Sequence, residues 1–328
     1  MTDSDLLAEF DALSVKLANA RAALKNIVFG QDDVIDLALG ALLAGGHALI
    51  VGAPGLAKTL LVTTIGDALG LSAKRVQFTP DLMPGDVIGS EVLEESADGK
   101  RAFRFVRGPV FCQLLMADEI NRASPRTQSA LLQAMQEQHV TVAGERHDLP
   151  APFHVLATQN PIEQEGTYPL PEAQLDRFLV QINIDYPSAD AEKQMLAATT
   201  GGSAKGLEAV MTPDELDRAQ KLVRGMPTSE RLVDATLNLV RAMRPTETAS
   251  EQIQNWVRWG PGPRASQALI LMARAMALLD GRRAPSTDDL RALANPVLRH
   301  RTALNFAAIQ DGMTIDGLID ELSDKYLN

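Results

Sequence analysis

An apolar run followed by a glycine-containing loop decides the fold of this chain: HALIV at residues 47–51, then GAPGLAKT at residues 52–59. The run predicts a buried strand, and the apolar spacing after the loop predicts a helix from about Lys58 to Leu69. A strand, a loop and a helix in this order form a phosphate-binding site, because the loop amides and the helix N-terminus attract an anion. The sequence therefore predicts that a phosphate-bearing ligand binds here.

The loop fits the pattern G-x-x-x-x-G-K-[ST] except that Ala57 replaces the second glycine. We expect Lys58 to reach the β- and γ-phosphates of a nucleotide and Thr59 to bind Mg²⁺. The alternative is a glycine-rich turn with a surface lysine. The residues predicted to bind the nucleotide are Gly52, Ala53, Pro54, Gly55, Leu56, Ala57, Lys58, Thr59 and Leu60.

Polar residues follow two further predicted strands. The run LLMA at residues 114–117 ends in Asp118 and Glu119, and FHVLAT at residues 153–158 leads to Asn160. Ligands of open α/β sheets bind at the carboxyl ends of the strands, so we expect these side chains to lie beside the phosphate loop. Asp118 would hold Mg²⁺, Glu119 would polarise the attacking water and Asn160 would align it. For the two acids, the alternative is an exposed helix start, where carboxylates are favoured.

The order of the predicted elements indicates an α/β fold followed by helices. Strands alternate with helices between residues 27 and 190, which predicts a parallel sheet with helices on both faces. Residues 1–26 have the apolar spacing of an amphipathic helix. The boundary is set at residue 190, so residues 191–328 comprise most of a linker, expected at about 188–210, and a helical domain without strands at about 211–328. A short helix is also expected just before the strand at residues 114–118.

Two β-hairpins are predicted inside the α/β region. The first covers about residues 88–107 and turns at Asp98-Gly99, and the second covers about residues 140–149 and turns at Ala143-Gly144. The first hairpin also carries the one local basic strip in the sequence. This strip either contacts a substrate or is a solvated strand face, and its members are Arg101, Arg104 and Arg107.

The composition argues against several classes of protein. With 31 Lys+Arg against 42 Asp+Glu, the 328 residues carry a net charge of −11, unlike a dedicated nucleic-acid binder. The single cysteine, Cys112, excludes a disulfide framework and a cysteine-cluster metal site, and it favours a reducing cytoplasm. The apolar stretch at residues 37–56 is interrupted by glycines, His47 and Pro54, so a buried helix and strand are favoured over a membrane span.

Four stretches together carry a family resemblance: GAPGLAKT at residues 52–59, LLMADEINRASPRTQSALLQAMQE at 114–137, ATQNP at 157–161 and LPEAQLDRF at 170–178. In these stretches the chain closely resembles the MoxR family of AAA+ ATPases of the helix-2-insert type. The resemblance is dense over residues 27–190 and looser in the helical tail. It implies an AAA+ core with a parallel sheet and hairpin inserts, followed by a small all-α lid domain. It also implies that alanine is the usual residue at position 57.

The resemblance further implies roles for single residues. It assigns Asp118 and Glu119 to the second nucleotide motif, Asn160 to sensor 1, Arg177 to the arginine finger that reaches a neighbouring subunit, Arg264 to sensor 2 on the lid, and Val28, Gly30 and Gln31 to the adenine site.

Some of these roles have alternatives. Arg122 and Arg126 closely follow the acidic motif and are rival finger candidates, and Arg177 could instead pair with Asp176. For Arg264 the alternative is ordinary solvation at a helix start, and a functional Arg264 could act on its own subunit or on a neighbour.

The resemblance implies an ATPase that uses ATP and Mg²⁺ and forms a ring, expected to be a hexamer. It would work with a von Willebrand factor A-domain partner as a chaperone-like remodeller or activator of protein clients. One alternative is a nucleic-acid-dependent motor whose basic hairpin strip follows phosphates. The other is a scaffold whose shape is set by the bound nucleotide.

Overall fold

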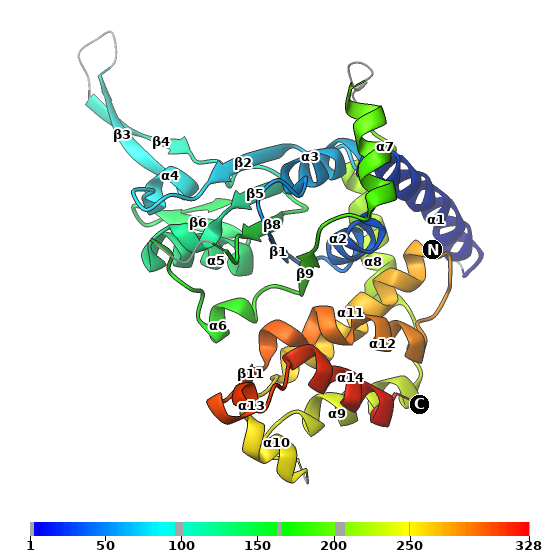
Figure 1. Ribbon diagram of the computed structural model, residues 1–328. Coiled ribbons are helices and arrows are strands. Elements are labelled where there is room, and N and C mark those ends of the chain that lie inside the picture. Colours follow the sequence, from blue (N-terminus) through cyan, green and yellow to red (C-terminus); the bar gives the residue numbers. More distant parts are fainter. Residues whose placement is uncertain (1–2, 96–100, 163–165, 201–206, 249, 328) are drawn as a thin grey trace.

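The computed structural model describes residues 3–95, 101–162, 166–200, 207–248 and 250–327. A five-stranded parallel sheet with the order β2-β5-β8-β1-β9 lies at the centre of the first half of the chain (Figure 1). The strands are β1 (Ala48–Gly52), β2 (Ala73–Gln77), β5 (Leu114–Asp118), β8 (His154–Gln159) and β9 (Val180–Ile184). The predicted α/β fold with a parallel sheet is therefore confirmed.

Both faces of the three inner strands β5, β8 and β1 are buried, which explains why these strands are apolar over nearly their whole length, whereas the edge strand β2 is largely exposed and carries polar residues. Leu114 and Met116 of β5 enter one apolar core, and Leu115 and Ala117 enter the other, because successive side chains point to opposite faces. The first core continues into the C-terminal helices. The helices of this half are α1 (Asp3–Lys25), α2 (Asp32–Leu43), α3 (Lys58–Ala68), α4 (Pro84–Ile88), α5 (Pro125–Glu137) and α6 (Glu172–Leu175).

Both predicted hairpins are present. The second consists of β6 (His139–Val142) and β7 (Glu145–Asp148), and its turn residues Ala143 and Gly144 both have positive φ, 50° and 88°. Two successive left-handed residues are the geometry of a two-residue hairpin turn. The first consists of β3 (Gly89–Glu95) and β4 (Arg101–Arg107) and projects from the sheet (Figure 1). Its predicted turn at Asp98-Gly99 lies outside the described residues.

The basic strip expected on the first hairpin is not formed. Because side chains alternate along a strand, Arg104 lies on the face opposite to Arg101 and Arg107. Arg101 Nε lies 3.0 Å from a carboxylate oxygen of Glu95, and Arg104 Nη2 lies 2.5 Å from one of Glu94. Two of the three cations are thus paired with acids of the opposite strand, which removes the continuous positive surface that a phosphate backbone needs.

Three local expectations are wrong, each at a site where tertiary contacts decide the structure. The first half of the expected linker is a helix, α7 (Ala189–Thr200), whose Ala191 is buried near Gly30. Residues 109–113 form turns rather than a helix, because the successive side chains 110–112 all enter the second core. The helical domain was expected to have no strands, but it contains the short pair β10 (Val257–Trp259) and β11 (Ala303–Leu304).

The C-terminal helical region begins with a capped helix at Pro213, just after the expected end of the linker near residue 210. The side-chain hydroxyl of Thr212 accepts a hydrogen bond from the backbone of Glu215, and the Glu215 carboxylate accepts one from the backbone of Thr212, a reciprocal capping box. The helices of this region are α8 (Pro213–Gly225), α9 (Glu230–Ala242), α10 (Glu251–Trp256), α11 (Pro263–Leu279), α12 (Thr287–Leu298), α13 (Phe306–Gln310) and α14 (Ile315–Tyr326).

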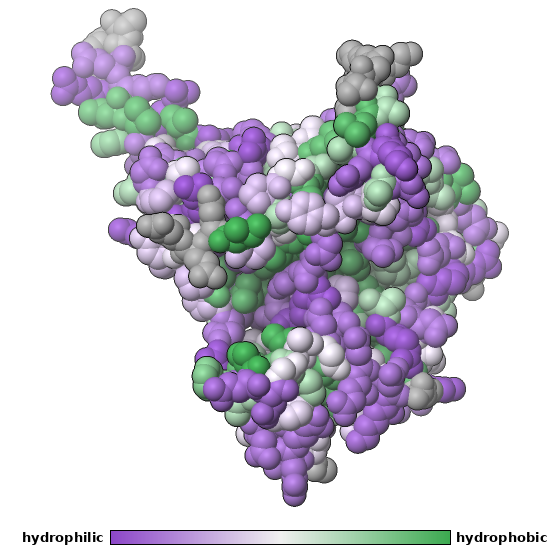
Figure 2. Space-filling model, viewed as in Figure 1, coloured by the Kyte–Doolittle hydropathy of each residue, from purple (hydrophilic) through white to green (hydrophobic). Residues whose placement is uncertain are grey.

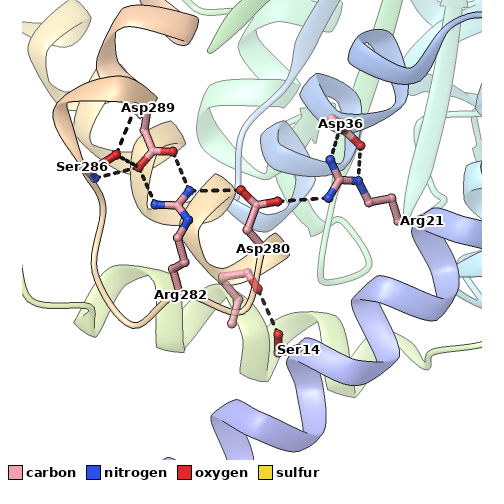
Figure 3. Close-up of polar contacts among 8 residues, drawn as sticks. Ser14, Arg21, Asp36, Asp280, Arg282, Ser286 and Asp289 are labelled. Atoms are coloured by element: carbon pink, nitrogen blue, oxygen red, sulfur yellow. Dashed lines mark hydrogen bonds and ion pairs between the residues drawn. The ribbon is translucent and has the colours of Figure 1, made fainter.

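The N-terminal helix connects the two halves of the molecule through an ion-pair network (Figure 3). Arg21 of α1 pairs with Asp36 of α2 through two nitrogens and with Asp280, at the end of α11, at 3.0 Å. Asp280 also pairs with Arg282 at 3.1 Å, and Arg282 reaches Asp289 of α12 at 2.6 Å. Hydrogen bonding to Asp36 raises the pKa of Arg21, so the guanidinium remains charged. The network therefore fixes α1 against both the sheet half and the helical region.

Among the described helices, none is both long and apolar enough to cross a membrane. The apolar stretch at residues 37–56 instead forms the end of α2, a turn, β1 and the start of the loop, as expected from its interrupting glycines.

Two buried histidines join the sheet to the helices around it. His47 accepts a hydrogen bond from the backbone N–H of Val155 at 2.9 Å, and its other ring nitrogen lies 3.2 Å from the Met135 carbonyl. His154 contacts the Gly46 carbonyl at 2.8 Å and the side chain of Gln220 of α8 at 2.9 Å. Burial lowers the pKa of His47 to about 3 and that of His154 to about 4.

These histidines should make the fold sensitive to acid. Their pKa is lowered only in the folded state, so the unfolded chain takes up protons below about pH 6.5 while the folded chain does not. Stability is full above about pH 6.5, and each histidine should contribute a loss of about 2 kcal/mol by pH 5. Urea unfolding at pH 7.5 and pH 5 measures this loss, and His154→Asn should reduce it. A pH dependence that His154→Asn leaves unchanged would contradict the assignment to His154.

Candidate nucleotide site

The phosphate loop connects the end of β1 to the first turn of α3. Two of its residues have positive φ, Gly55 (83°) and Ala57 (55°), which curls the backbone around the space above the helix N-terminus. Ala57 occupies the position of the second glycine of the pattern and adopts the left-handed conformation that a glycine would adopt there. The first amides of α3 lack intrahelical partners, so they and the helix dipole can bind phosphate oxygens.

Lys58 is the first residue of α3 and is almost fully buried. Its Nζ donates a hydrogen bond to the Gly52 carbonyl at 2.7 Å, across the mouth of the loop. Burial lowers the pKa of Lys58, and the nearby carboxylates of Asp118 and Glu119 partly oppose this shift. The following residues, Thr59 and Leu60, are exposed at the surface of the same helix turn. This arrangement can hold a polyphosphate against the amides, the ammonium and a hydroxyl.

Asp118 is held at the end of β5 by hydrogen bonds from both neighbouring strands. Its Oδ1 accepts from the hydroxyl of Thr158 of β8 at 2.5 Å, and its Oδ2 accepts from Arg75 of β2 at 2.5 Å. Neighbouring strands on both sides therefore orient this carboxylate. The sequence interpretation missed both partners. For Arg75 a signal existed, because polar Arg75 and Gln77 alternate with apolar Val76, as on a half-buried strand.

Glu119 lies in the left-handed region, with φ 55° and ψ 50°, which costs a non-glycine residue about 1 kcal/mol or more. Its backbone N–H donates to the Thr158 hydroxyl at 2.9 Å, which stabilises the turn. Its carboxylate accepts from Gln77 at 2.8 Å and from Arg122 at 3.1 Å. Strain is maintained at functional positions when surrounding contacts determine the conformation. Here the contacts described above fix the direction in which the Glu119 carboxylate projects from the end of β5.

Asn160 follows β8, the strand between β5 and β1 in the sheet. It is 4% exposed, and its Oδ1 accepts a hydrogen bond from the backbone of Ile162 at 3.1 Å, which fixes the side chain. Three consecutive strands thus end in the phosphate loop, Asn160 and the Asp118–Glu119 pair. The predicted meeting of these motifs at one edge of the sheet is found in the structure.

Of the three residues predicted to contact adenine, Gln31 contacts the phosphate loop. Gln31 is buried, and its Nε2 donates to the Leu56 carbonyl of the loop at 3.2 Å. Its Oε1 is buried without a hydrogen-bond partner in the described structure, so it offers an acceptor for an exocyclic amine such as that of adenine. Gly30 has φ 69°, and a Cβ there would lie 2.5 Å from Ala191 of α7. Val28 is buried in the adjoining core.

The structure places Arg177 and Arg264 far from this loop. Arg177 precedes β9, whose first residue, Val180, pairs with Ala48 at the amino end of β1. The loop begins at the opposite end of β1, about 13 Å away along the strand. Arg177 donates to the Leu132 carbonyl at 2.9 Å and, with Arg264 of α11, lines a cavity of about 250 Å³. Of the rival candidates, Arg122 pairs with Glu119 at 3.1 Å at the carboxyl end of β5, and Arg126 lies in the first turn of α5.

Comparison with known proteins agrees with this geometry. Residues 47–180 match the ATPase family associated with various cellular activities (AAA), and residues 250–322 match the AAA lid domain. Chaperone MoxR1 of Mycobacterium tuberculosis is 40% identical, over 93% of this chain and 80% of that protein. Protein MoxR of Paracoccus denitrificans is 34% identical, over 88% of this chain and 89% of that protein. A crystal structure from Cytophaga hutchinsonii, assigned as an ATPase, superposes with a TM-score of 0.90 at 34% identity, covering 98% and 97% of the two chains.

Proposed function

Since this chain belongs to the MoxR family of AAA+ ATPases and hydrolyses ATP, we propose that it does so as a chaperone-like ring of identical subunits, a hexamer. The ring would remodel or activate protein clients together with a von Willebrand factor A-domain partner in the cytoplasm. As part of this proposal the chain divides into an N-terminal helix to residue 26, an AAA+ domain to residue 190, and a linker with a helical lid.

The proposed chemistry uses the residues at the carboxyl edge of the sheet. The loop amides and Lys58 hold the phosphates, Glu119 polarises a water for attack on the γ-phosphorus, and Asn160 aligns that water. Thr59 and Asp118 would hold Mg²⁺, and their hydroxyl and carboxylate oxygens are the donors that this ion prefers. The ion supplies positive charge that neutralises the phosphate oxygens. The buried acceptor of Gln31 supports adenine as the base.

The observation that most supports the proposed ring is the position of Arg177 and Arg264. Arg177 and Arg264 line one cavity at the amino end of β1, opposite to the chain's own phosphate loop. A cation that stabilises the transferring phosphoryl group must touch it. We therefore propose that both arginines act on the nucleotide of a neighbouring subunit, which makes hydrolysis depend on assembly.

The first hairpin supports a protein client rather than a nucleic acid. Leu93 and Phe103 face each other across β3 and β4 and are 51% and 69% exposed. Figure 2 shows this apolar surface near the projecting end of the hairpin. Exposed aromatic and aliphatic side chains suit contact with proteins, while the arginines on the hairpin are largely paired with acids.

Removing the Lys58 ammonium should test both the site and the assembly. In Lys58→Ala, ATP hydrolysis should fall by about 10²–10³ because a buried charge that contacts the phosphates is lost. For the unchanged protein, the rate per subunit should rise with protein concentration until the ring is complete. Steady-state ATPase assays over a range of protein concentrations measure both. Normal hydrolysis by Lys58→Ala would refute the site, and a rate independent of concentration in a monomeric preparation would refute the ring.

A further inference from the structure

A buried arginine of the helical region holds the segment that carries Arg177. Arg301 lies on the 3₁₀ turn after α12 and is 2% exposed. All five of its N–H groups donate hydrogen bonds. Four of these go to the segment 176–179: Nε to Asp176 Oδ1 at 2.7 Å, and the others to the carbonyls of Asp176 at 3.3 Å, Phe178 at 2.7 Å and Leu179 at 3.0 Å. The fifth goes to Val297 of α12.

The same carboxylate also faces Arg264. Asp176 Oδ1 is bound to Arg301, and Asp176 Oδ2 lies 3.8 Å from Arg264 Nη1. Arg177 is the next residue after Asp176, and all three arginines line the cavity at the amino end of β1. Arg177 itself donates to a backbone carbonyl rather than to Asp176. The alternative pairing of Arg177 with Asp176 is therefore not the one observed, because Arg301 takes this carboxylate.

The hydrogen bonds of Arg301 are more specific than is needed merely to hold the helical region against the sheet half. Burying a guanidinium costs several kcal/mol unless its charge and donors are satisfied, and an apolar residue of similar size would fill the space without that cost. The planar guanidinium of Arg301 instead donates to three backbone carbonyls and one carboxylate of this segment at the same time, which fixes the backbone conformation at residues 176–179. A lysine has only three donors in a rotating group and cannot reproduce this geometry.

We propose that Arg301 is a positioning residue that presents Arg177 and Arg264 to the nucleotide of the neighbouring subunit. This inference rests on the proposed action of those arginines in trans. A displacement of about 1 Å in a catalytic group can cost about 10²-fold in rate. Arg301 therefore acts through its neighbours, and it lies at the end of the sheet opposite to its own phosphate loop.

The test uses Arg301→Lys, with Arg299→Lys as the matched control. Arg299 lies on the same turn but pairs with Asp316 of the helical region, at 3.1 Å. In Arg301→Lys assemblies, kcat should fall about 10²-fold, while the affinity of each subunit's own site for ATP stays within about twofold. Arg299→Lys should keep the normal kcat. Asp176→Asn should reproduce the loss of kcat, and it provides the test should Arg301→Lys fail to fold.

Assemblies that mix two kinds of variant subunit distinguish a positioning role of Arg301 from a merely structural one. A Lys58→Ala subunit has a defective nucleotide site but intact arginines, so mixing it with Arg301→Lys subunits should restore hydrolysis at about a quarter of the interfaces. Arg177→Ala subunits mixed with Lys58→Ala subunits test action in trans by itself. A gain with Arg177→Ala but none with Arg301→Lys would overturn the positioning role alone. No gain in either mixture would overturn the proposed action in trans, and the positioning role with it.

Discussion

Arg177→Ala should lower kcat for ATP hydrolysis by about 10³-fold or more, since a cationic finger contributes about 10³–10⁵ to phosphoryl transfer. The affinity for ATP should remain near that of the unchanged protein, because Arg177 lies at the end of the sheet opposite to its own phosphate loop. Measured on assembled protein, kcat and the dissociation constant for ATP should therefore change independently. This separation is the signature expected of a group that contacts the nucleotide only across a subunit interface.

Arg126→Ala is the matched control for this prediction. Arg126 is an exposed arginine in the first turn of α5, the helix that follows β5 and the acidic pair at its end. It should affect kcat by far less than Arg177→Ala. If Arg126→Ala abolished hydrolysis while Arg177→Ala left it intact, the finger would be Arg126 acting within its subunit. Weaker ATP binding in Arg177→Ala, with kcat unchanged, would also contradict the assignment.

The carboxyl edge of the sheet could be predicted from the sequence because its parts are local patterns. Strand, loop and helix follow one another at Ala48–Ala68, and the acidic pair and Asn160 each lie at the end of a mainly apolar strand. Parallel strands bring such ends together whatever their order, so Asp118, Glu119 and Asn160 could be grouped without knowing the topology. The alternation around Arg75 indicates a strand, but neither Arg75 nor Thr158 could be assigned to Asp118, because the pairing of β2 with β5 and of β5 with β8 is not local.

The contacts at the amino end of the sheet could not be predicted either, because they too join residues far apart in the sequence. Asp176 and Arg301 are separated by 125 residues, and nothing in the spacing of either segment indicates that they touch. The cis or trans action of Arg264 was also left open by the sequence, and its place near Asp176 gives the geometric reason for proposing trans. The prediction of a basic strip on the first hairpin was wrong for the opposite reason. Its arginines are close in sequence, but strand alternation and the acids of β3 divide and neutralise them.

Glu119→Gln should separate ATP binding from turnover. Loss of the group that activates water should lower kcat by about 10²–10⁴. Glutamine has the same size, and its side-chain oxygen can still accept from Gln77 or Arg122, so the loop and its affinity for ATP should be preserved. Thermal unfolding with and without ATP checks the affinity: at 100 times the dissociation constant, bound ATP should stabilise the fold by about 2.7 kcal/mol. Lys58→Ala should lose most of that stabilisation.

The same variant distinguishes a machine that needs repeated turnover from a scaffold whose shape is set by ATP. Loaded with ATP, Glu119→Gln assemblies should hold the partner and client without releasing them, so the complex can be isolated and its proteins identified. If each client needs several cycles, this complex should accumulate without activating the client. Full activation in a single round would show that binding alone is sufficient, and turnover would then only reset the ring. Hydrolysis at the normal rate would instead show that Glu119 is not the activating group, although its strained turn is held by contacts from β2 and β8.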